Sequence, residues 1–282
     1  MKCIISSLSF CLGFGLALAA APLRAEQIFA EDLTALPAAD VVILGEVHDN
    51  PEHHRNQAVA LAAIMPKAIV FEMLTPDQAT RVPADRSEMA ALEQALQWNA
   101  SGWPDFSMYY PIFTAAPAAA IYGADVPRPD VRAALDKGAA AVFGADAARF
   151  GLDQPLDPGE QAARENEQQA VHCDALPADS LPGMVQAQRL RDAALARAVV
   201  MAHQATGGPI VVITGSGHAR KDWGVPAVLS VAAPELSVLS IGQVELDAGE
   251  NPPWDKWLVT AAVERADPCA AFGNGGTLGD GG

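Results

Sequence analysis

One segment constrains the fold of this 282-residue chain more than any other, the run Val-Val-Ile-Leu-Gly-Glu-Val-His-Asp-Asn-Pro at 41–51. An aliphatic run without polar alternation is typical of a strand that is covered on both faces, as in a parallel sheet between two helical layers. Asn50 is a favourable helix N-cap, and Pro51 suits the first helical position. Apolar residues then recur at helical spacing as far as Pro66. The segment therefore predicts a strand, a polar turn and a helix, which is the first unit of an α/β fold.

Later parts of the chain repeat this pattern. Three further apolar runs end on acids or on a second Gly-x-x-His motif, at 67–73, 118–125 and 209–220. Segments 236–241 and 257–263 are additional strand candidates, whereas 130–206 is rich in helix-forming residues. We therefore predict a single α/β domain, with a central, mostly parallel or mixed β-sheet flanked by α-helices and with a helical insertion.

Polar side chains follow the predicted strands. Since ligands in open α/β sheets bind beyond the carboxyl ends of the strands, we expect these side chains to converge on one site. If the first two strands are neighbours, Glu72 lies beside Glu46. The polar groups at the four strand ends are Glu46, His48, Asp49, Glu72, Asp125, His218 and Arg220.

Such a set of side chains has more than one chemical use. Two imidazoles with carboxylates can bind a divalent metal ion, or they can form a metal-free general acid and base. A lone acid after a strand is usually a helix cap or a turn stabiliser. Two Gly-x-x-His motifs at the ends of two well-formed strands favour a site instead. His53 and His54, in the first predicted helix, are compatible with ligation or with a solvated or capping role.

The N-terminus predicts export. Lys2 precedes an apolar stretch that ends in small residues, which is typical of a secretory signal peptide, and we place it at 1–25. Bulky residues before Cys11 disfavour a lipid anchor, so a periplasmic or otherwise exported chain is expected. No later apolar stretch is long enough for a transmembrane helix. The folded domain is predicted at 26–272, and the glycine-rich tail at 273–282 is predicted to be disordered.

Charge and cysteine content narrow the partners and the compartment. The formal net charge is −16, which repels nucleic acid and anionic lipid, so no nucleic-acid partner is expected. Two cysteines remain after the predicted signal peptide, Cys173 and Cys269. In an oxidising compartment an even pair favours a disulfide over two buried thiols.

Ordered motifs along the chain resemble the ChaN family of haem-binding uptake proteins, within the Tiki and erythromycin-esterase-like superfamily. The resemblance implies a central mixed sheet flanked by helices and an exported protein that binds haem in a cleft near the strand ends, as part of iron uptake. A homodimer and an outer-membrane or periplasmic haem-transport partner are left open. The motifs are Gly45 to Pro51 with His53-His54, Phe71 to Leu74, Gly102 to Asp105 with Tyr109 and Pro111, His172-Cys173, Pro182 to Met184 with Gln188-Arg189, Arg191-Asp192, Gly215 to Arg220, and Asp267 to Cys269.

The resemblance also implies roles for individual residues. Tyr109 matches the family tyrosine, and a phenolate suits oxidised haem iron, with Tyr110 as the second choice. Imidazoles are the alternative axial ligands, and arginines can donate charge-assisted hydrogen bonds to the haem propionates. The imidazoles are His48, His53, His172 and His218, and the arginines are Arg189, Arg191 and Arg220. The candidate ligands for a divalent metal are Glu46, His48, Glu72 and His218.

An enzymatic alternative stays open beside the favoured, non-enzymatic haem-binding role. The superfamily contains hydrolases built on the same two Gly-x-x-His motifs and a following glutamate, which correspond to His48, His218 and Glu72. A metal, Glu46 or Glu72 would activate water, and His218 with Arg220 would stabilise negative charge. A third class, a binding protein whose site has decayed, is disfavoured because these groups are intact.

Overall fold

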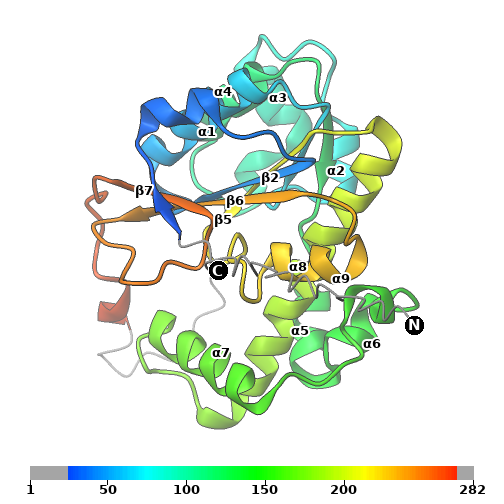
Figure 1. Cartoon of the computed structure of the whole chain (residues 1–282), viewed down its shortest axis with the longest axis vertical. Coiled ribbons are helices and arrows are strands. Elements are labelled where there is room, and N and C mark those ends of the chain that lie inside the picture. The colour runs from blue at the N-terminus through cyan, green and yellow to red at the C-terminus, as the bar shows by residue number, and fades with distance from the viewer. Residues whose placement is uncertain (1–24, 272–282) are drawn as a thin grey trace, which may run out of the picture.

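The computed structural model describes residues 25–271, and the chain forms one seven-stranded sheet with helices on both faces (Figure 1). Every strand pair is parallel and the strand order is β1-β7-β6-β2-β5-β3-β4. This confirms the α/β prediction, and only β1 was not expected. The tail and all but the last residue of the predicted signal peptide lie outside the described residues. The strands are β1 Glu26–Gln27, β2 Val41–Glu46, β3 Ala68–Phe71, β4 Ala120–Gly123, β5 Ile210–Gly215, β6 Val238–Glu245 and β7 Lys256–Thr260.

The sheet order corrects one prediction. β5 lies between β2 and β3, so Glu46 and Glu72 do not follow neighbouring strands. Every residue of β2, β3 and β5 is buried, because helices cover both faces of the central sheet. β5, which follows β2 and β3 in the sequence, therefore lies between them in the sheet.

One face of the sheet carries an aromatic layer. Its helices are α1 Pro51–Ile64, α3 Met89–Leu96 and α4 Phe106–Ala115, with α2 Pro76–Thr80 and the short 3-10 helices η1 Ala30–Ala35 and η2 Trp98–Ala100. Helix α1 begins as predicted, with the Asn50 side chain accepting a hydrogen bond from the Glu52 backbone N–H and Pro51 in the first turn. Helix α4 is rich in aromatic residues, and its Phe113 stacks on Phe71 of β3 with ring centroids 4.5 Å apart.

The opposite face carries the predicted helical insertion and the helix that follows β5 (Figure 1). Its helices are α5 Arg128–Lys137, α6 Ala139–Phe143, α7 Pro158–Val171, α8 Leu181–Thr206 and α9 Val225–Ala232, with η3 Ala147–Phe150 and η4 Ala178–Ser180. The long helix α8 buries mainly alanine, leucine and valine against the sheet. It ends at Gly207, whose φ of 77° is the left-handed conformation that suits glycine. None of the helices in residues 25–271 is long and apolar enough to cross a membrane.

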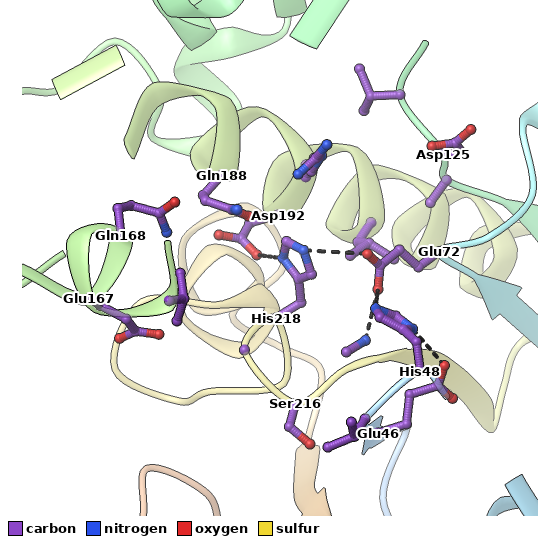
Figure 2. A pocket seen from close by; sticks show the side chains of 18 of the residues that line it. Glu46, His48, Glu72, Asp125, Glu167, Gln168, Gln188, Asp192, Ser216 and His218 are labelled. Atoms are coloured by element: carbon purple, nitrogen blue, oxygen red, sulfur yellow. Dashed lines mark hydrogen bonds and ion pairs between the residues drawn. The ribbon is translucent and has the colours of Figure 1, made fainter. Parts of the chain in front are cut away.

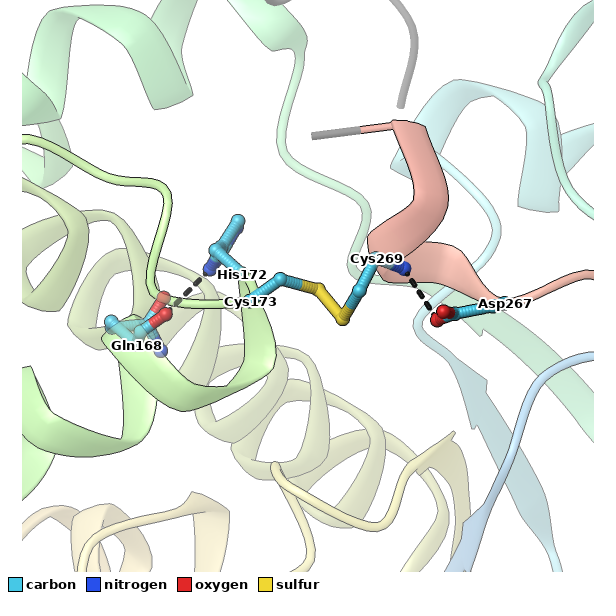
Figure 3. Close-up of a disulfide and its surroundings, with 5 residues drawn as sticks. All are labelled: Gln168, His172, Cys173, Asp267 and Cys269. Carbon is cyan, nitrogen blue, oxygen red and sulfur yellow. Dashed lines mark hydrogen bonds between the residues drawn. A yellow bond between two sulfur atoms is a disulfide. The ribbon is translucent and has the colours of Figure 1, made fainter. Parts of the chain in front are cut away.

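A disulfide between Cys173 and Cys269 ties the end of α7 to the 3-10 helix η5 Pro268–Ala271 (Figure 3). The two cysteines are 96 residues apart in sequence, and the bond confirms the predicted pairing. Arg265 holds the same C-terminal segment by ion pairs with Asp49 and Glu245. The C-terminal segment is therefore fixed both to the sheet and to α7.

Candidate functional site

A pocket of about 930 Å³ lies at the carboxyl ends of β2, β3 and β5, as the order of the parallel strands requires. The sheet supplies the base, and side chains of α7 and α8 line the side away from it (Figure 2). Of the seven polar residues expected to converge, all except Arg220 line the pocket: Glu46, His48, Asp49, Glu72, Asp125 and His218.

Glu46 is the buried anchor of the site. Its carboxylate accepts hydrogen bonds from the Nδ1 atom of His48 at 2.8 Å, from the amide of Gln57 at 2.7 Å and from the hydroxyl of Tyr109 at 2.8 Å. Burial raises the pKa of Glu46, but the hydrogen bond from His48 and the close approach of His54 outweigh it and hold the pKa at about 2. The preceding Gly45 is required by packing, because an added Cβ would lie 2.9 Å from the backbone of Ser216.

His48 presents its other nitrogen to the pocket. Its side chain is 31% exposed, and its Nε2 atom lies 3.9 Å from the Glu72 carboxylate. Burial lowers the pKa of His48, but the charge of Glu72 and the hydrogen bond to Glu46 raise it to about 9. Trp103 packs beside this imidazole, with ring centroids 4.8 Å apart. His48 is therefore a fixed cation at neutral pH with one accessible edge.

Glu72 lies between two imidazoles, and His218 is the second (Figure 2). The Nε2 atom of His218 is 3.5 Å from Glu72, while the Thr214 hydroxyl and the Gly215 backbone N–H donate to the same carboxylate at 2.6 and 2.8 Å. Burial raises the pKa of Glu72, but the charges of His218 and His48 lower it overall.

Asp192 of α8 completes the arrangement. Its carboxylate accepts a hydrogen bond of 2.6 Å from the Nδ1 atom of His218. Burial lowers the pKa of His218, whereas the charges of Glu72 and Asp192 raise it, and the net shift is upward. Carboxylates and imidazoles thus alternate across the pocket in the order Glu46, His48, Glu72, His218 and Asp192. Such an array can bind a cation, donate protons or orient a water molecule.

No role was predicted for Asp192, although it forms part of a family motif. An acid on the alanine-rich, sheet-facing side of a helix was the available signal, because a buried carboxylate requires a partner. The pocket residues on α7, Glu167 and Gln168, were also missed, since nothing local to that helix indicates that it borders the strand ends.

Arg191 is the pocket's available guanidinium. It lines the pocket and lowers the pKa of Asp125, which burial raises overall. In the part of the chain that the structure describes, Arg191 forms no hydrogen bond and no ion pair within 4.0 Å. By contrast, Arg164 pairs with Glu160, and Arg265 pairs with Asp49.

The two predicted tyrosines do not line the pocket. Tyr109 is completely buried, donates to Glu46, and has a pKa that burial and the Glu46 charge raise far above its usual value. Tyr110 donates its hydroxyl to the backbone carbonyls of Arg86 and Ser87. Both hydroxyls serve internal acceptors, because α4 packs its aromatic side into the core.

The other predicted haem contacts also lie outside the pocket. Arg189 donates to the backbone carbonyls of Gly151 and Gln154. Arg220 pairs with Glu167 and Asp222, and its guanidinium lies 3.7 Å from the centre of the Trp223 ring. His172 lies beside the disulfide and donates from Nδ1 to the carbonyl of Gln168 (Figure 3). In each case the polar atoms hold loops or helices together.

His53 and His54 are buried, so the solvated role considered for them is wrong. The Nδ1 atom of His53 accepts from the Val47 N–H at 2.8 Å, and its Nε2 atom meets the Thr260 hydroxyl at 2.7 Å. Burial lowers the pKa of His53 to about 4, so this imidazole is neutral. His54 bonds the carbonyl of His48 and lies 3.4 Å from Glu46. Both therefore support the turn that carries His48.

The predicted metal ligands do not form a metal site in the described residues. Across residues 25–271, no group of three or more His, Cys, Asp or Glu side chains is arranged to hold one. Glu46 and Asp192 each accept a hydrogen bond from an imidazole Nδ1 atom, whereas the Nε2 atoms of His48 and His218 lie 3.9 and 3.5 Å from Glu72 without a hydrogen bond in the described residues. The divalent metal stays a prediction.

Comparisons with known proteins decide the family. The family model described as "Haem-binding uptake, Tiki superfamily, ChaN" matches residues 33–229. The chain belongs to this family. The match spans the pocket strands β2, β3 and β5 together with α7 and α8, so the family region contains the array from Glu46 to His218.

Solved structures are similar to this chain, and one with a TM-score above 0.5 shares its fold. One, described as cofacial haem binding to ChaN of Campylobacter jejuni, has 19% sequence identity, a TM-score of 0.59 and coverage of 79% of this chain and 89% of that chain. A mutant of the erythromycin esterase EreC in its open conformation has 12% identity, a TM-score of 0.39 and coverage of 74% and 71%. No curated protein matched.

Proposed function

We propose that this chain is an exported haem-binding protein of haem or iron uptake, and that haem occupies the pocket at the strand ends. Family membership supports the ligand, and the lining supports the location. A haem site needs an apolar slot, an axial ligand and donors for the propionates. The decisive observation is that one cavity of about 930 Å³ combines two carboxylate-held imidazoles with an arginine that has no carboxylate partner among residues 25–271. Its apolar lining comes from Trp103, Ala124, Val126, Val171, Val185, Leu195 and Trp223.

His48 is the residue that would bind the haem iron. Bound haem supplies an iron ion that accepts a nitrogen or oxygen donor, and the donor must reach the cavity. The His48 side chain is 31% exposed, that of His218 is 12% exposed and Tyr109 is completely buried. Ligation through Nε2 requires loss of its proton, while Glu46 keeps the Nδ1 hydrogen and the ring orientation.

Arg191 is the proposed propionate donor. Binding costs least for a cation that breaks no existing ion pair, and Arg164, Arg220 and Arg265 already hold carboxylates. A guanidinium can grip a carboxylate through two parallel hydrogen bonds. We therefore propose Arg191, rather than Arg189 or Arg220, as the residue that binds a haem propionate.

A haemin titration followed by the Soret band tests the proposal. We expect saturable binding that weakens about tenfold or more in His48→Gln and in Arg191→Gln, because each removes a direct contact. Matched controls are His172→Gln, an imidazole outside the pocket, and Arg197→Gln, which lies on α8 but outside this cavity; both should bind as the parent does. Normal binding by His48→Gln and Arg191→Gln, with loss in Tyr109→Phe, would reject the assignment.

Hydrolysis remains the second candidate, because Glu72 is held between His48 and His218 as an acid–base group would be. The same preparation, assayed with an ester and a peptide substrate, should show turnover that Glu72→Gln abolishes if this function operates. Turnover that is absent, or unchanged in Glu72→Gln, argues against it.

Export, assembly and transfer complete the proposal. Amino-terminal sequencing of the periplasmic protein should begin at Glu26 if the signal peptide is cleaved after Ala25. Light scattering with and without haemin tests the homodimer, and the rate of haem release to a candidate transport protein tests the partner. A protein retained in the cytoplasm with its first residues intact would contradict export.

A further inference from the structure

A second cavity of about 530 Å³ lies beside the open edge strand β4, between α2, α6 and α8. It is separate from the proposed haem pocket, and the two share only the segment Ala124 to Val126. Most of its lining is apolar, which suits the body of a small organic ligand. The apolar lining residues include Ile121, Val142, Phe143, Leu190, Ala198 and Met201.

Two hydrogen-bond donors in this lining have no acceptor in the described residues. Arg197 of α8 is half-buried and contacts the face of Phe143, with its guanidinium carbon 4.2 Å from the ring centre. No carboxylate in residues 25–271 lies within 4.0 Å of the Arg197 nitrogens. The Tyr122 hydroxyl, on the sheet face that α8 covers, likewise has no hydrogen-bond partner there. A ligand that carries an anionic acceptor would satisfy both groups.

The charges along the cavity indicate where that acceptor would lie. Asp125 and Asp130 border it where β4 leads into α5, beyond the carboxyl end of the sheet. Asp192, which contacts His218, shows which part of α8 lies near this carboxyl end of the sheet. Arg197 is five residues further along α8, about 7.5 Å away along the helix axis. An anion bound at Arg197 would therefore lie away from the carboxylates of Asp125 and Asp130.

We propose that this cavity binds an amphipathic monocarboxylate, with its carboxylate on Arg197 and Tyr122 and its apolar body against α6 and α8. A single anionic group matches Arg197, the one guanidinium among the described residues that line this cavity, and the apolar lining disfavours a small, highly polar acid. The proposal does not depend on haem binding, because none of the donors it uses lines the first pocket.

Calorimetric titration of the full chain tests the head group by comparing dodecanoate, dodecan-1-ol and dodecylamine, which share one apolar chain. We expect dodecanoate to bind with one site and at least about tenfold more tightly than the other two. Equal binding of the alcohol, or preferential binding of the amine through the acids, overturns the proposal. The absence of saturable dodecanoate binding overturns it as well.

Variants locate the site. Arg197→Gln should weaken dodecanoate about tenfold and Tyr122→Phe about threefold. Arg191→Gln, the matched arginine of the first pocket, should not change it, and excess haemin should not displace it. Ala198→Leu, which fills the cavity, should reduce binding while thermal unfolding shows that the protein remains folded. Unchanged affinity in Arg197→Gln, or displacement by haemin, would assign the carboxylate elsewhere and refute the site.

Discussion

The two faces of the sheet are packed in different ways. On the α1, α3 and α4 face, Trp98, Phe106, Tyr109 and Phe113 are essentially inaccessible and contact one another. On the α8 face, the helix presents mostly alanine and valine, and both large cavities are lined from that side. Small side chains leave space between the sheet and its helices, whereas stacked aromatics fill it. The face of α1, α3 and α4, called the dense face below, supports Glu46. The face of α8, called the open face below, lines both cavities.

The largest expected effect is on the dense face. Phe113→Ala should lower the free energy of unfolding by about 3–5 kcal/mol, because it removes a stacked, fully buried ring. Leu190→Ala, the matched truncation on the open face, should cost about 2 kcal/mol, since Leu190 already borders a cavity. Urea unfolding of both variants measures the difference. Equal losses of unfolding free energy in the two variants would contradict the difference in packing between the two faces.

The disulfide should matter mainly on the open face. Cys173→Ser with Cys269→Ser should cost about 2–4 kcal/mol in urea unfolding, because the bond closes a long loop. Hydrogen exchange should rise in α7, whose main helical contact is α8, and should not change in α4. Reduction of the parent protein by dithiothreitol is the control and should match the double variant. Faster exchange confined to α4 would contradict this placement.

The smallest expected effect concerns His53, on the dense face. Its pKa is about 4 in the folded chain and about 6.5 when unfolded, because burial disfavours the charged imidazole. The unfolded state therefore binds more protons between these values, so stability is complete above pH 6.5 and is lost as the pH falls towards 4, with a loss of about 2 kcal/mol by about pH 5. His53→Asn should lack this part of the acid slope in unfolding experiments, and His172→Asn should retain it. If His53→Asn loses stability in acid as steeply as the parent protein does, this part of the acid dependence does not come from His53.

Sequence patterns predicted strands well where the residues are uniformly apolar. The runs at 41–46, 68–71 and 210–215 are buried on both faces, so their composition alone defines them. The aromatic stretch at 106–113 forms a helix that packs its rings into the core. The Gly-x-x-His motifs predicted where His48 and His218 would meet, because parallel strands end on one side.

Individual roles at the site were less predictable. Tyr109 has the residue type of a haem ligand, yet its neighbours bury it against Glu46. Three arginines were equivalent by sequence, and only packing separates Arg189 and Arg220, which are bonded within the fold, from Arg191.

The sequence by itself determined the α/β architecture, the helical insertion, the cysteine pair and the collection of acids and imidazoles at strand ends, because these depend on local composition and on the geometry of parallel strands. Only the tertiary structure decided that β5 separates β2 from β3, that Asp192 reaches His218, and that Arg191 and Arg197 have no carboxylate partner within the described part of the chain. Those outcomes depend on which side chains meet across long sequence separations, and hydrogen bonds, ion pairs and burial form only when those side chains meet.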